Sequence, residues 1–570
     1  MKKFILGFII GLVFAGLAGL IVVFAAMRLG GEKKTDVAAN STVVLRLEGE
    51  IPEQAPVDVG VQQILGEQSP MTMAETWELL RKAAMDSRVK YLLLEPRGLT
   101  AGWAKLEELR ADIVAFKKSG KPVYAYLRGA GAHEYYVATA ADKIYMAPED
   151  SLDVKGLRAE LMYLKGSLDK LGVEMEFEHI GKYKDAPDSF TKTGPSPETL
   201  EVMNQILDQY WGNLVGVIAD GRKKKPEEIR TLLDQGPFLG PAAVEAGLLD
   251  GLKFPDELEV KDNLVSDRAY SKADVSGFEG KTKIAMLVGD GEITRGASSD
   301  SINDTGISSG GMIKRLRQVS DDSDIKGVIL RIDSPGGDAT ASDDILHEAQ
   351  ALSKKKPVVI SMSDTAASGG YFIAMTGDPI LAYANTLTGS IGVFSGRINL
   401  RGLYDKIGLK KEILTRGHFA NLDSDYGPLT AEERTKVHAE IEAFYKGFVE
   451  RVATGRKRKY DEMEPLAQGR VWLGAQAKKN GLIDEIGGLD RALELIKEKA
   501  KIPASERVSL VMYPPRRTVL DYLLNRNNDE EGIETALVRR KIRSLIGNIP
   551  VEALARGGVM RLMPFAIEVK

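Results

Sequence analysis

Cysteine is absent from the 570 residues, and histidine occurs only five times. Without cysteine, the chain has no disulfide, no thiolate metal site and no cysteine nucleophile. Basic residues are not in excess either, because 77 lysines and arginines face 81 acidic residues, for a formal charge of -4. This balance gives no indication of nucleic-acid binding. The composition is that of an ordinary globular protein, long enough for two or three domains.

A stretch without charge lies at the N-terminus, at residues 4–27, after the short basic segment 1–3. Its 24 residues are enough to cross about 30 Å of hydrocarbon as a single helix. We expect an uncleaved membrane anchor, with a cytoplasmic N-terminus and the bulk of the chain on the other side. A cleaved secretory signal is the alternative, but its apolar core is usually about 7 to 15 residues long, and "FAAM" is a poor cleavage site.

The chain contains an internal repeat with an offset of 236 residues, which is the separation of Asp86 from Asp322. The segment "DSRVKYLLLEPRG" aligns with "DSDIKGVILRIDS" at this offset, and "YYVATAADKIYMA" aligns with "YFIAMTGDPILAY". A register kept over about 95 residues indicates two related domains. The expected organisation is a linker, an N-terminal domain, a C-terminal domain and a tail, at residues 28–42, 43–265, 280–510 and 511–570.

Strand and helix patterns alternate within each copy. "VILRID" and "PVVISM" are short apolar runs rich in β-branched residues, which is typical of buried strands. Between them, "ASDDILHEAQALSKKK" places its apolar residues at helical spacing, namely Ile345, Leu346, Ala349 and Leu352. This is a β-α-β unit, so the predicted class is α/β, with parallel sheets covered by crossover helices and a helical lobe at the end of each copy.

The segment "SDTAASGGYF" places Ser368 where a predicted strand turns into a helix. A nucleophilic serine needs exposure on such a turn, an adjacent base, and donors for the developing oxyanion. The turn and the helix start that follows it make Ser368 the candidate nucleophile. A small serine that merely packs a tight turn is the alternative.

A second glycine-rich turn, "RIDSPGGDAT", follows another predicted strand. Gly336 and Gly337 allow the backbone to approach a bound carbonyl and direct an N–H group towards it. Together with Gly369, they are the candidates for an oxyanion hole. A glycine pair alone is usually only a turn, but one helix and one strand separate this pair from "ASGGY", and the combination is specific.

The repeat indicates which residue activates the serine. The first copy carries Ala132 where the second has Ser368, and the second copy carries Ala420 where the first has Lys184. Each copy has therefore kept one half of a site. A buried lysine serves as a general base because desolvation lowers its pKa. We interpret Ser368 and Lys184 as a dyad across the two halves.

Two other bases compete with Lys184. His418 lies 50 residues after Ser368 and is the best histidine candidate, but no histidine occupies a recognisable triad context. Lys182 lies two positions before Lys184, and a solvated surface lysine is the ordinary alternative for either. The complementary losses in the two copies favour Lys184.

With "DSPGG", "ASGGY", "TGSIGV" and "GKYK" in place, the chain resembles the long, duplicated form of bacterial signal peptide peptidase A, a family of membrane-anchored serine proteases with a Ser–Lys dyad. The resemblance covers nearly everything from the anchor to about residue 500. It implies that Ser368 is the nucleophile, that Lys184 is the base, and that Ser390 hydrogen-bonds the lysine. It also implies a fold similar to Clp-type proteases and crotonases.

The same resemblance implies the biological setting. Substrates would be hydrophobic peptides, the remnants of signal peptides left in the membrane after secretion. The protein would be a homotetramer in the bacterial inner membrane, single-pass and in contact with the bilayer, with its catalytic domains on the periplasmic side. It would need no metal and no other cofactor and would bind no nucleic acid. The alternatives are an inactive oligomeric scaffold or peptide chaperone, and a crotonase-like acyl-CoA enzyme.

Overall fold

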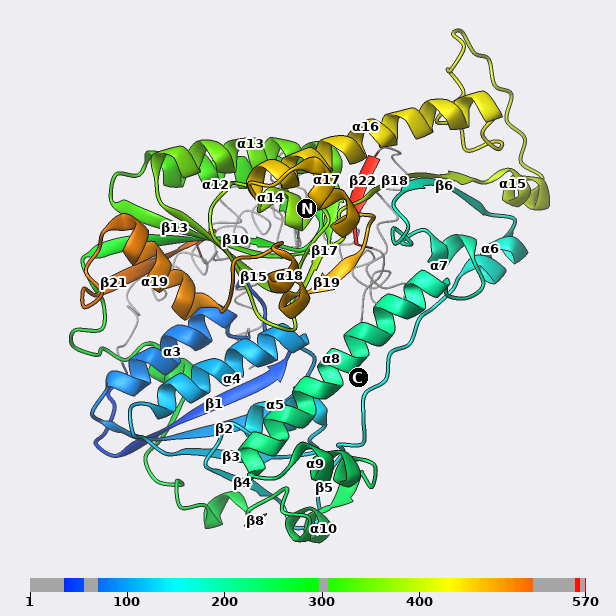
Figure 1. The fold of residues 1–570 in the computed structure, drawn as a ribbon. Coiled ribbons are helices and arrows are strands. Elements are labelled where there is room, and N and C mark those ends of the chain that lie inside the picture. The colour runs from blue at the N-terminus through cyan, green and yellow to red at the C-terminus, as the bar shows by residue number, and fades with distance from the viewer. Residues whose placement is uncertain (1–34, 56–69, 297–305, 516–558, 564–568, 570) are drawn as a thin grey trace, which may run out of the picture.

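The computed structural model describes residues 35–55, 70–296, 306–515, 559–563 and 569. It forms an α/β structure with one mainly parallel sheet in each half of the chain, drawn in blue and in green in Figure 1. The α/β class expected from the sequence is thereby confirmed. The predicted anchor at 4–27 lies outside the described residues, and no helix among the described residues is both long and apolar enough to cross a membrane.

The sheet of the first half has the strand order β8-β4-β3-β2-β1-β9, with every neighbouring pair parallel. Its strands are β1 (Ser41–Gly49), β2 (Val89–Leu99), β3 (Val123–Leu127), β4 (Lys143–Met146), β8 (Gly251–Leu252) and β9 (Leu264–Ser266). A separate pair is formed by β5 (Ser151–Leu152) and β7 (Phe238–Leu239). The helices of this half are α3 (Met73–Met85), α4 (Trp103–Lys117), α5 (Ala132–Ala138), α6 (Lys165–Leu171), α7 (Asp188–Thr191), α8 (Pro197–Arg222), α9 (Pro226–Leu233), α10 (Gly240–Glu245) and α11 (Asp267–Ser271).

The sheet of the second half has the main order β19-β17-β15-β13-β10-β21. Its strands are β10 (Thr282–Asp290), β13 (Ile325–Ser334), β15 (Val358–Ala367), β16 (Ile380–Ala382), β17 (Leu387–Gly389), β19 (Val471–Leu473), β20 (Glu485–Ile486) and β21 (Val508–Tyr513). The helices are α12 (Ser309–Asp321), α13 (Ala339–Lys355), α14 (Gly369–Ile373), α15 (Arg401–Ile407), α16 (Ala431–Gly455), α17 (Tyr460–Met463), α18 (Gly474–Asn480) and α19 (Leu489–Ala500). Because β21 pairs with β10, this sheet runs to Tyr513, past the expected domain end at residue 510.

Helix α13 shows how the sequence pattern produces the crossover. Its four apolar residues at helical spacing are all buried, as expected from the sequence. The Asp338 carboxylate caps the start of the helix by accepting a hydrogen bond from the Ala341 N–H at 2.8 Å. The helix joins the parallel strands β13 and β15, so the predicted β-α-β unit is present and holds both glycine-rich turns at the ends of neighbouring strands.

A third sheet crosses between the halves, in the order β12-β11-β14-β22-β18-β6. Its strands are β6 (Glu174–Ile180), β11 (Ile293–Thr294), β12 (Ile307–Ser308), β14 (Gly336–Asp338), β18 (Val393–Asn399) and β22 (Val559–Leu562). Strand β6 of the first half pairs antiparallel with β18 of the second, from Ile180 opposite Val393 to Glu174 opposite Asn399. Figure 1 shows this pair extending to the right, between α16 and α7. Lys184 lies four residues after β6 and thereby enters the second half.

Candidate active site

Ser368 lies at the turn between β15 and α14, in a backbone conformation that is unusual for a side chain-bearing residue. Its φ is 52° and its ψ is -113°. Such a conformation costs energy and persists only where the surroundings hold it. The Ser368 N–H donates to the Gly389 carbonyl at 2.8 Å, and its own carbonyl accepts from the Phe372 N–H at 2.8 Å. The strained turn expected from the sequence is present, but the side chain is fully buried rather than exposed.

The Lys184 amine lies against the Ser368 hydroxyl, 2.9 Å from Nζ to Oγ. The same Nζ is 3.0 Å from Ser390 Oγ and 3.1 Å from the Ser390 carbonyl oxygen. The lysine is fully buried, and burial holds the pKa of Lys184 well below its ordinary value; the Arg561 charge lowers it further, while Asp185 opposes both. A neutral amine at hydrogen-bond distance from a serine hydroxyl can accept its proton.

The second half of the chain shapes the place that Lys184 occupies. The Tyr183 N–H donates to the Gln468 carbonyl at 2.8 Å, which fixes the residue just before the lysine. At Gly469, whose φ is 75°, an added Cβ would lie 2.6 Å from the Lys184 Cβ. No residue other than glycine fits there without displacing the lysine backbone. The close approach explains how a residue of the first half reaches the end of β15.

Ser390 follows β17 and, like Ser368, has a positive φ, of 50°. Its N–H donates to the Arg470 carbonyl at 2.7 Å, and its side chain is fully buried. The hydroxyl and carbonyl oxygens of Ser390 both lie within hydrogen-bond distance of the Lys184 amine, and no bond joins Ser390 to Ser368 among the described contacts.

The three candidate oxyanion glycines lie together at the ends of β13 and β15. The Gly336 N–H donates to the Ser334 hydroxyl at 3.2 Å, so it is already engaged. Gly337 in β14 and Gly369 at the start of α14 remain as the candidate donors. An oxyanion site needs such N–H groups on the same side as the nucleophile, and Gly369 directly follows Ser368.

The competing bases lie elsewhere. Lys182 is 59% exposed and pairs with Glu198 at 3.6 Å. His418 is 66% exposed, and its Nε2 lies 2.9 Å from a carboxylate oxygen of Glu432. All five histidines lie in the described part of the chain, and no hydrogen bond there joins any of them to Ser368. Within the described residues, no group of three or more His, Asp or Glu side chains is arranged to hold a metal ion.

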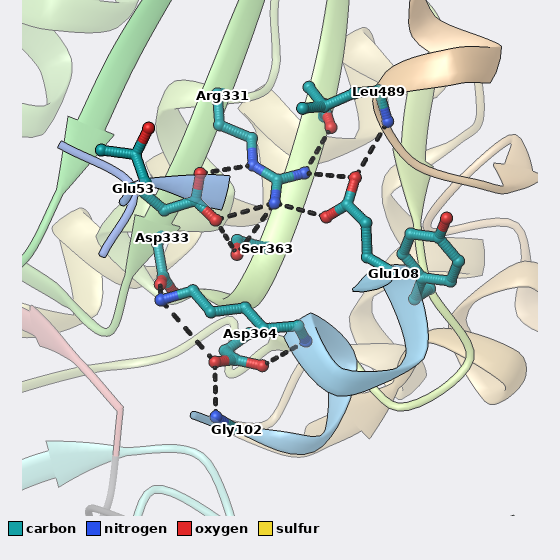
Figure 2. A network of polar contacts seen from close by, with 12 residues as sticks. Glu53, Gly102, Glu108, Arg331, Asp333, Ser363, Asp364 and Leu489 are labelled. Atoms are coloured by element: carbon teal, nitrogen blue, oxygen red, sulfur yellow. Dashed lines mark hydrogen bonds and ion pairs between the residues drawn. The ribbon is translucent and has the colours of Figure 1, made fainter. Parts of the chain in front are cut away.

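A buried charge network, which was not predicted from the sequence, links residues of β13 and β15 to the first half (Figure 2). Arg331 of β13, fully buried, pairs with Glu53 at 2.7 Å and with Glu108 at 2.5 Å, both from the first half. Lys105 of α4 lies 2.8 Å from an oxygen of Asp333 and 3.8 Å from one of Asp364. The network therefore joins the first half to β13 and β15, the strands that carry the glycine turn and Ser368.

Asp364 of the second half is held by the start of α4 in the first half. Its two carboxylate oxygens accept hydrogen bonds from the backbone N–H groups of Gly102 and Lys105, at 2.9 and 2.8 Å. Asp333 accepts a bond from the Thr365 N–H at 2.9 Å. The only sequence signal for this network is the spacing of Lys105, Glu108 and Asp112, three charged residues on one face of a helix.

The model of peptidase family S49 matches residues 115–264 and 350–503, the segments that contain Lys184, Ser368 and Ser390. The chain belongs to peptidase family S49. The chloroplastic serine protease SPPA of Arabidopsis thaliana is 34% identical over 518 residues, covering 88% of this chain and 75% of that protein. Protease 4 of Haemophilus influenzae is 32% identical over 524 residues, covering 86% and 84%. This S49 chain is accordingly a serine peptidase.

Shorter relatives of the S49 chain align with part of it. The putative signal peptide peptidase SppA of Enterococcus faecium is 32% identical over 231 residues, covering 40% of this chain and 62% of that protein. Among solved structures, ClpP1 from Listeria monocytogenes aligns with 36% of this chain and 91% of its own, at 16% identity and a TM-score of 0.22.

Proposed function

We propose that this S49 peptidase is a membrane-anchored endopeptidase with a Ser368–Lys184 dyad, and that it degrades the remnants of signal peptides. The observation that carries the dyad is the 2.9 Å contact between the buried Lys184 amine and the Ser368 hydroxyl. The other polar atoms in contact with the amine are oxygens of Ser390, so no carboxylate among the described residues touches it and holds it protonated.

The proposed reaction starts with proton transfer from Ser368 Oγ to Lys184 Nζ. The oxygen attacks the peptide carbonyl, and the carbonyl oxygen becomes an oxyanion that the Gly337 and Gly369 N–H groups stabilise. The protonated Lys184 then gives its proton to the leaving amine as the C–N bond breaks. Ser390 keeps the amine directed at the serine through both transfers.

Hydrolysis of the acyl-enzyme then regenerates the enzyme. Lys184, neutral again, takes a proton from a water molecule, which attacks the acyl-enzyme carbonyl. The C–O bond to Ser368 then breaks, and the proton on Lys184 returns to Ser368 Oγ. Every proton moves between substrate, water and these two side chains, so the sequence balances without a further reactant.

The substrate class and the location follow from the anchor and the resemblance. An anchored protease with its catalytic halves on the periplasmic side of the bacterial inner membrane would meet signal peptide remnants in the bilayer. The name of the Enterococcus faecium relative supports this substrate class. A homotetramer open towards the membrane would collect such peptides, and extended apolar peptides would bind by strand addition.

The test is cleavage of an apolar peptide by the full chain in detergent. We expect Ser368→Ala and Lys184→Met each to lose at least about 10⁴-fold in kcat, because neither proton transfer nor attack remains. Lys182→Ala, two residues away and exposed, is the matched control and should retain activity. Retained activity in Lys184→Met would overturn the dyad, and no cleavage by the unaltered chain would favour an inactive scaffold.

A further inference from the structure

Arg470 precedes β19 and contacts both segments that meet at the Lys184 amine. Its carbonyl oxygen accepts the hydrogen bond from the Ser390 N–H, and Ser390 supplies two of the three oxygen atoms that the amine contacts. Its guanidinium carbon lies 4.7 Å from the centroid of the Tyr183 ring, and Tyr183 directly precedes Lys184. One residue therefore contacts the neighbours of the base with its main chain and with its side chain.

The guanidinium of Arg470 has further partners on both halves. Its carbon lies 4.6 Å from the centroid of the Trp472 ring in β19. Nη1 pairs with a carboxylate oxygen of Glu201 at 2.7 Å, and Nη2 donates to the side-chain oxygen of Gln205 at 2.9 Å, both on α8 of the first half. A planar guanidinium stacks on aromatic rings and donates from its edge at the same time, which a lysine ammonium does not do.

Glu201 links the two side chains to each other. One of its carboxylate oxygens accepts from Arg470, and the other accepts a hydrogen bond from the Tyr183 hydroxyl at 3.1 Å. The hydrogen bond from Arg470 lowers the pKa of Glu201, so the carboxylate is charged at neutral pH. We call Arg470, Tyr183 and Glu201 the clamp. Because the Tyr183 N–H is also bonded to the Gln468 carbonyl, both the ring and the main chain of Tyr183 are held on the second half.

The internal repeat separates Arg470 from an ordinary surface arginine. The first copy reads "QGPFLG" at residues 235–240, where the second reads "QGRVWLG" at 468–474, so the first copy has no arginine at this place. The carboxylate partner is missing from the second copy in turn. Glu201 lies five residues after the capping residue of α8, and the residue five positions after the cap of α16 is Thr435. Each copy has kept only the part of the clamp that serves the junction containing the lysine.

We propose that Arg470 is a positioning residue that, through the clamp, keeps the Lys184 amine at hydrogen-bond distance from Ser368. The inference rests on the proposed function of the site. Among the described contacts, Arg470 touches neither the amine nor the Ser368 hydroxyl, so it acts through its neighbours and takes no proton. Proton transfer depends on close approach, and a displacement of about 1 Å can lower a rate about 100-fold.

The test compares cleavage of an apolar peptide by two variants of the full chain in detergent. Arg470→Met keeps the main chain and most of the side-chain volume but removes the guanidinium, so kcat should fall about 10- to 100-fold while KM stays nearly unchanged. Arg456→Met is the matched control, because Arg456 is also nearly buried and pairs with a carboxylate, that of Asp484 at 2.7 Å. Among the described contacts, Arg456 touches no residue of the clamp. The control should lose stability, measured by denaturant unfolding, and keep the kcat of the folded enzyme.

A double-mutant cycle tests whether Arg470 acts through Tyr183. Tyr183→Ala removes the ring on which the guanidinium lies, so adding Arg470→Met to it should lower kcat by less than about twofold more. Effects that multiply would overturn the inference. A rise of KM at unchanged kcat in Arg470→Met would also overturn it, because Arg470 would then be a peptide-binding residue, and so would unchanged kinetics in that variant.

Should Arg470→Met not fold, Glu201→Gln weakens the clamp at its more exposed end, where the Glu201 side chain is 42% exposed. This variant should lower kcat about threefold to tenfold, and an unchanged kcat would then overturn the inference. Full activity of Lys184→Met would instead count against the proposed function. An enzyme that requires Lys184 but is insensitive to Arg470 would count against this inference alone.

Discussion

Among the described residues, two lysines are buried almost completely, and their surroundings differ. Lys184 is 0% exposed and Lys105 is 3% exposed. The Lys184 amine contacts the hydroxyls of Ser368 and Ser390 and a carbonyl oxygen. The Lys105 amine contacts the carboxylates of Asp333 and Asp364. Burial lowers the pKa of both lysines, but beside Lys105 the two carboxylates outweigh it and raise the pKa well above the ordinary value.

The comparison shows that burial lowers the pKa of a lysine below its ordinary value only where no carboxylate contacts the amine. Desolvation disfavours the charged ammonium form of both lysines, and a carboxylate in contact with the amine stabilises that form by more than desolvation costs. Lys105 is therefore a fixed cation that pairs α4 with Asp333 of β13 and Asp364 of β15, while the low pKa of Lys184 suits the base that we propose. The two roles differ because the amine of Lys105 contacts aspartates and the amine of Lys184 contacts serines.

The largest expected effect comes from giving Lys184 the kind of partner that Lys105 has. In the unaltered chain the Lys184 amine lies 3.0 Å from the Ser390 hydroxyl, so Ser390→Asp puts a carboxylate next to the amine. The pKa of Lys184 should rise, the amine should remain protonated at pH 7, and kcat/KM at that pH should fall at least about 100-fold. The loss should shrink as the pH rises, because the neutral amine is then restored. A full pH–rate profile measures this.

Ser390→Asn is the matched control, equal in size but uncharged. Both aspartate and asparagine tolerate the positive φ of residue 390, so backbone strain does not separate them. Equal activity of the two variants at every pH would contradict the idea that a carboxylate partner decides whether a buried lysine is a base.

The next effect is on stability. Lys105→Met leaves Asp333 and Asp364 without their cation, and breaking a buried pair in this way should cost about 3 to 5 kcal/mol in the free energy of unfolding. The pKa of Asp364 is already raised to about 6 by burial, and without Lys105 it should rise further. A carboxyl whose pKa is higher in the folded than in the unfolded state favours folding at low pH, and this contribution disappears as the pH rises. The stability that Lys105→Met loses should therefore be greater at pH 7 than at pH 4.

Denaturant unfolding at several pH values measures this prediction, with Lys105→Arg as the control that keeps the charge. The acid limb of the pH–rate profile should not move for the molecules that remain folded, because Lys105 takes no part in proton transfer. A displaced limb in Lys105→Met would show that the two lysines are coupled and that the division of roles is wrong.

The sequence revealed Lys184 but not Lys105, for a physical reason. The repeat exposed Lys184 because its counterpart is Ala420, so the two halves could be compared residue by residue. Lys105, Glu108 and Asp112 follow a helical period, which from sequence indicates a solvated face. In the structure, that face is buried between the two halves. Helical periodicity alone does not distinguish a charged face that is paired at an interface from one that is exposed to water.

Strand β22 shows a second limit. It is four residues long, and its partners β14 and β18 lie more than 150 residues earlier in the chain. A strand that short has too few alternations to predict pairing, and nothing local specifies a partner so distant. The α/β class and the turns that carry Ser368 and Gly336 depend on local patterns, and these were predictable. The cross-half pairing β6–β18 and the long-range pairing β14–β22 depend on the tertiary fold.

The smallest expected effect sharpens the comparison within the environment of Lys184 itself. Asp185, whose own pKa burial raises to about 6, is a carboxylate whose charge raises the pKa of Lys184. No bond joins its side chain to the amine among the described contacts; one carboxylate oxygen accepts a hydrogen bond from the Thr199 hydroxyl, and the other is buried without a partner there. Asp185→Asn should lower the pKa of Lys184 and move the acid limb of the pH–rate profile to lower pH, by less than about one unit. Thr199→Val removes a hydrogen bond that lowers the pKa of Asp185, so Asp185 should carry less charge and the limb should move in the same direction by a smaller amount. A limb that moves to higher pH in Asp185→Asn would mean that Asp185 acts on Lys184 through the position of its backbone rather than through its charge.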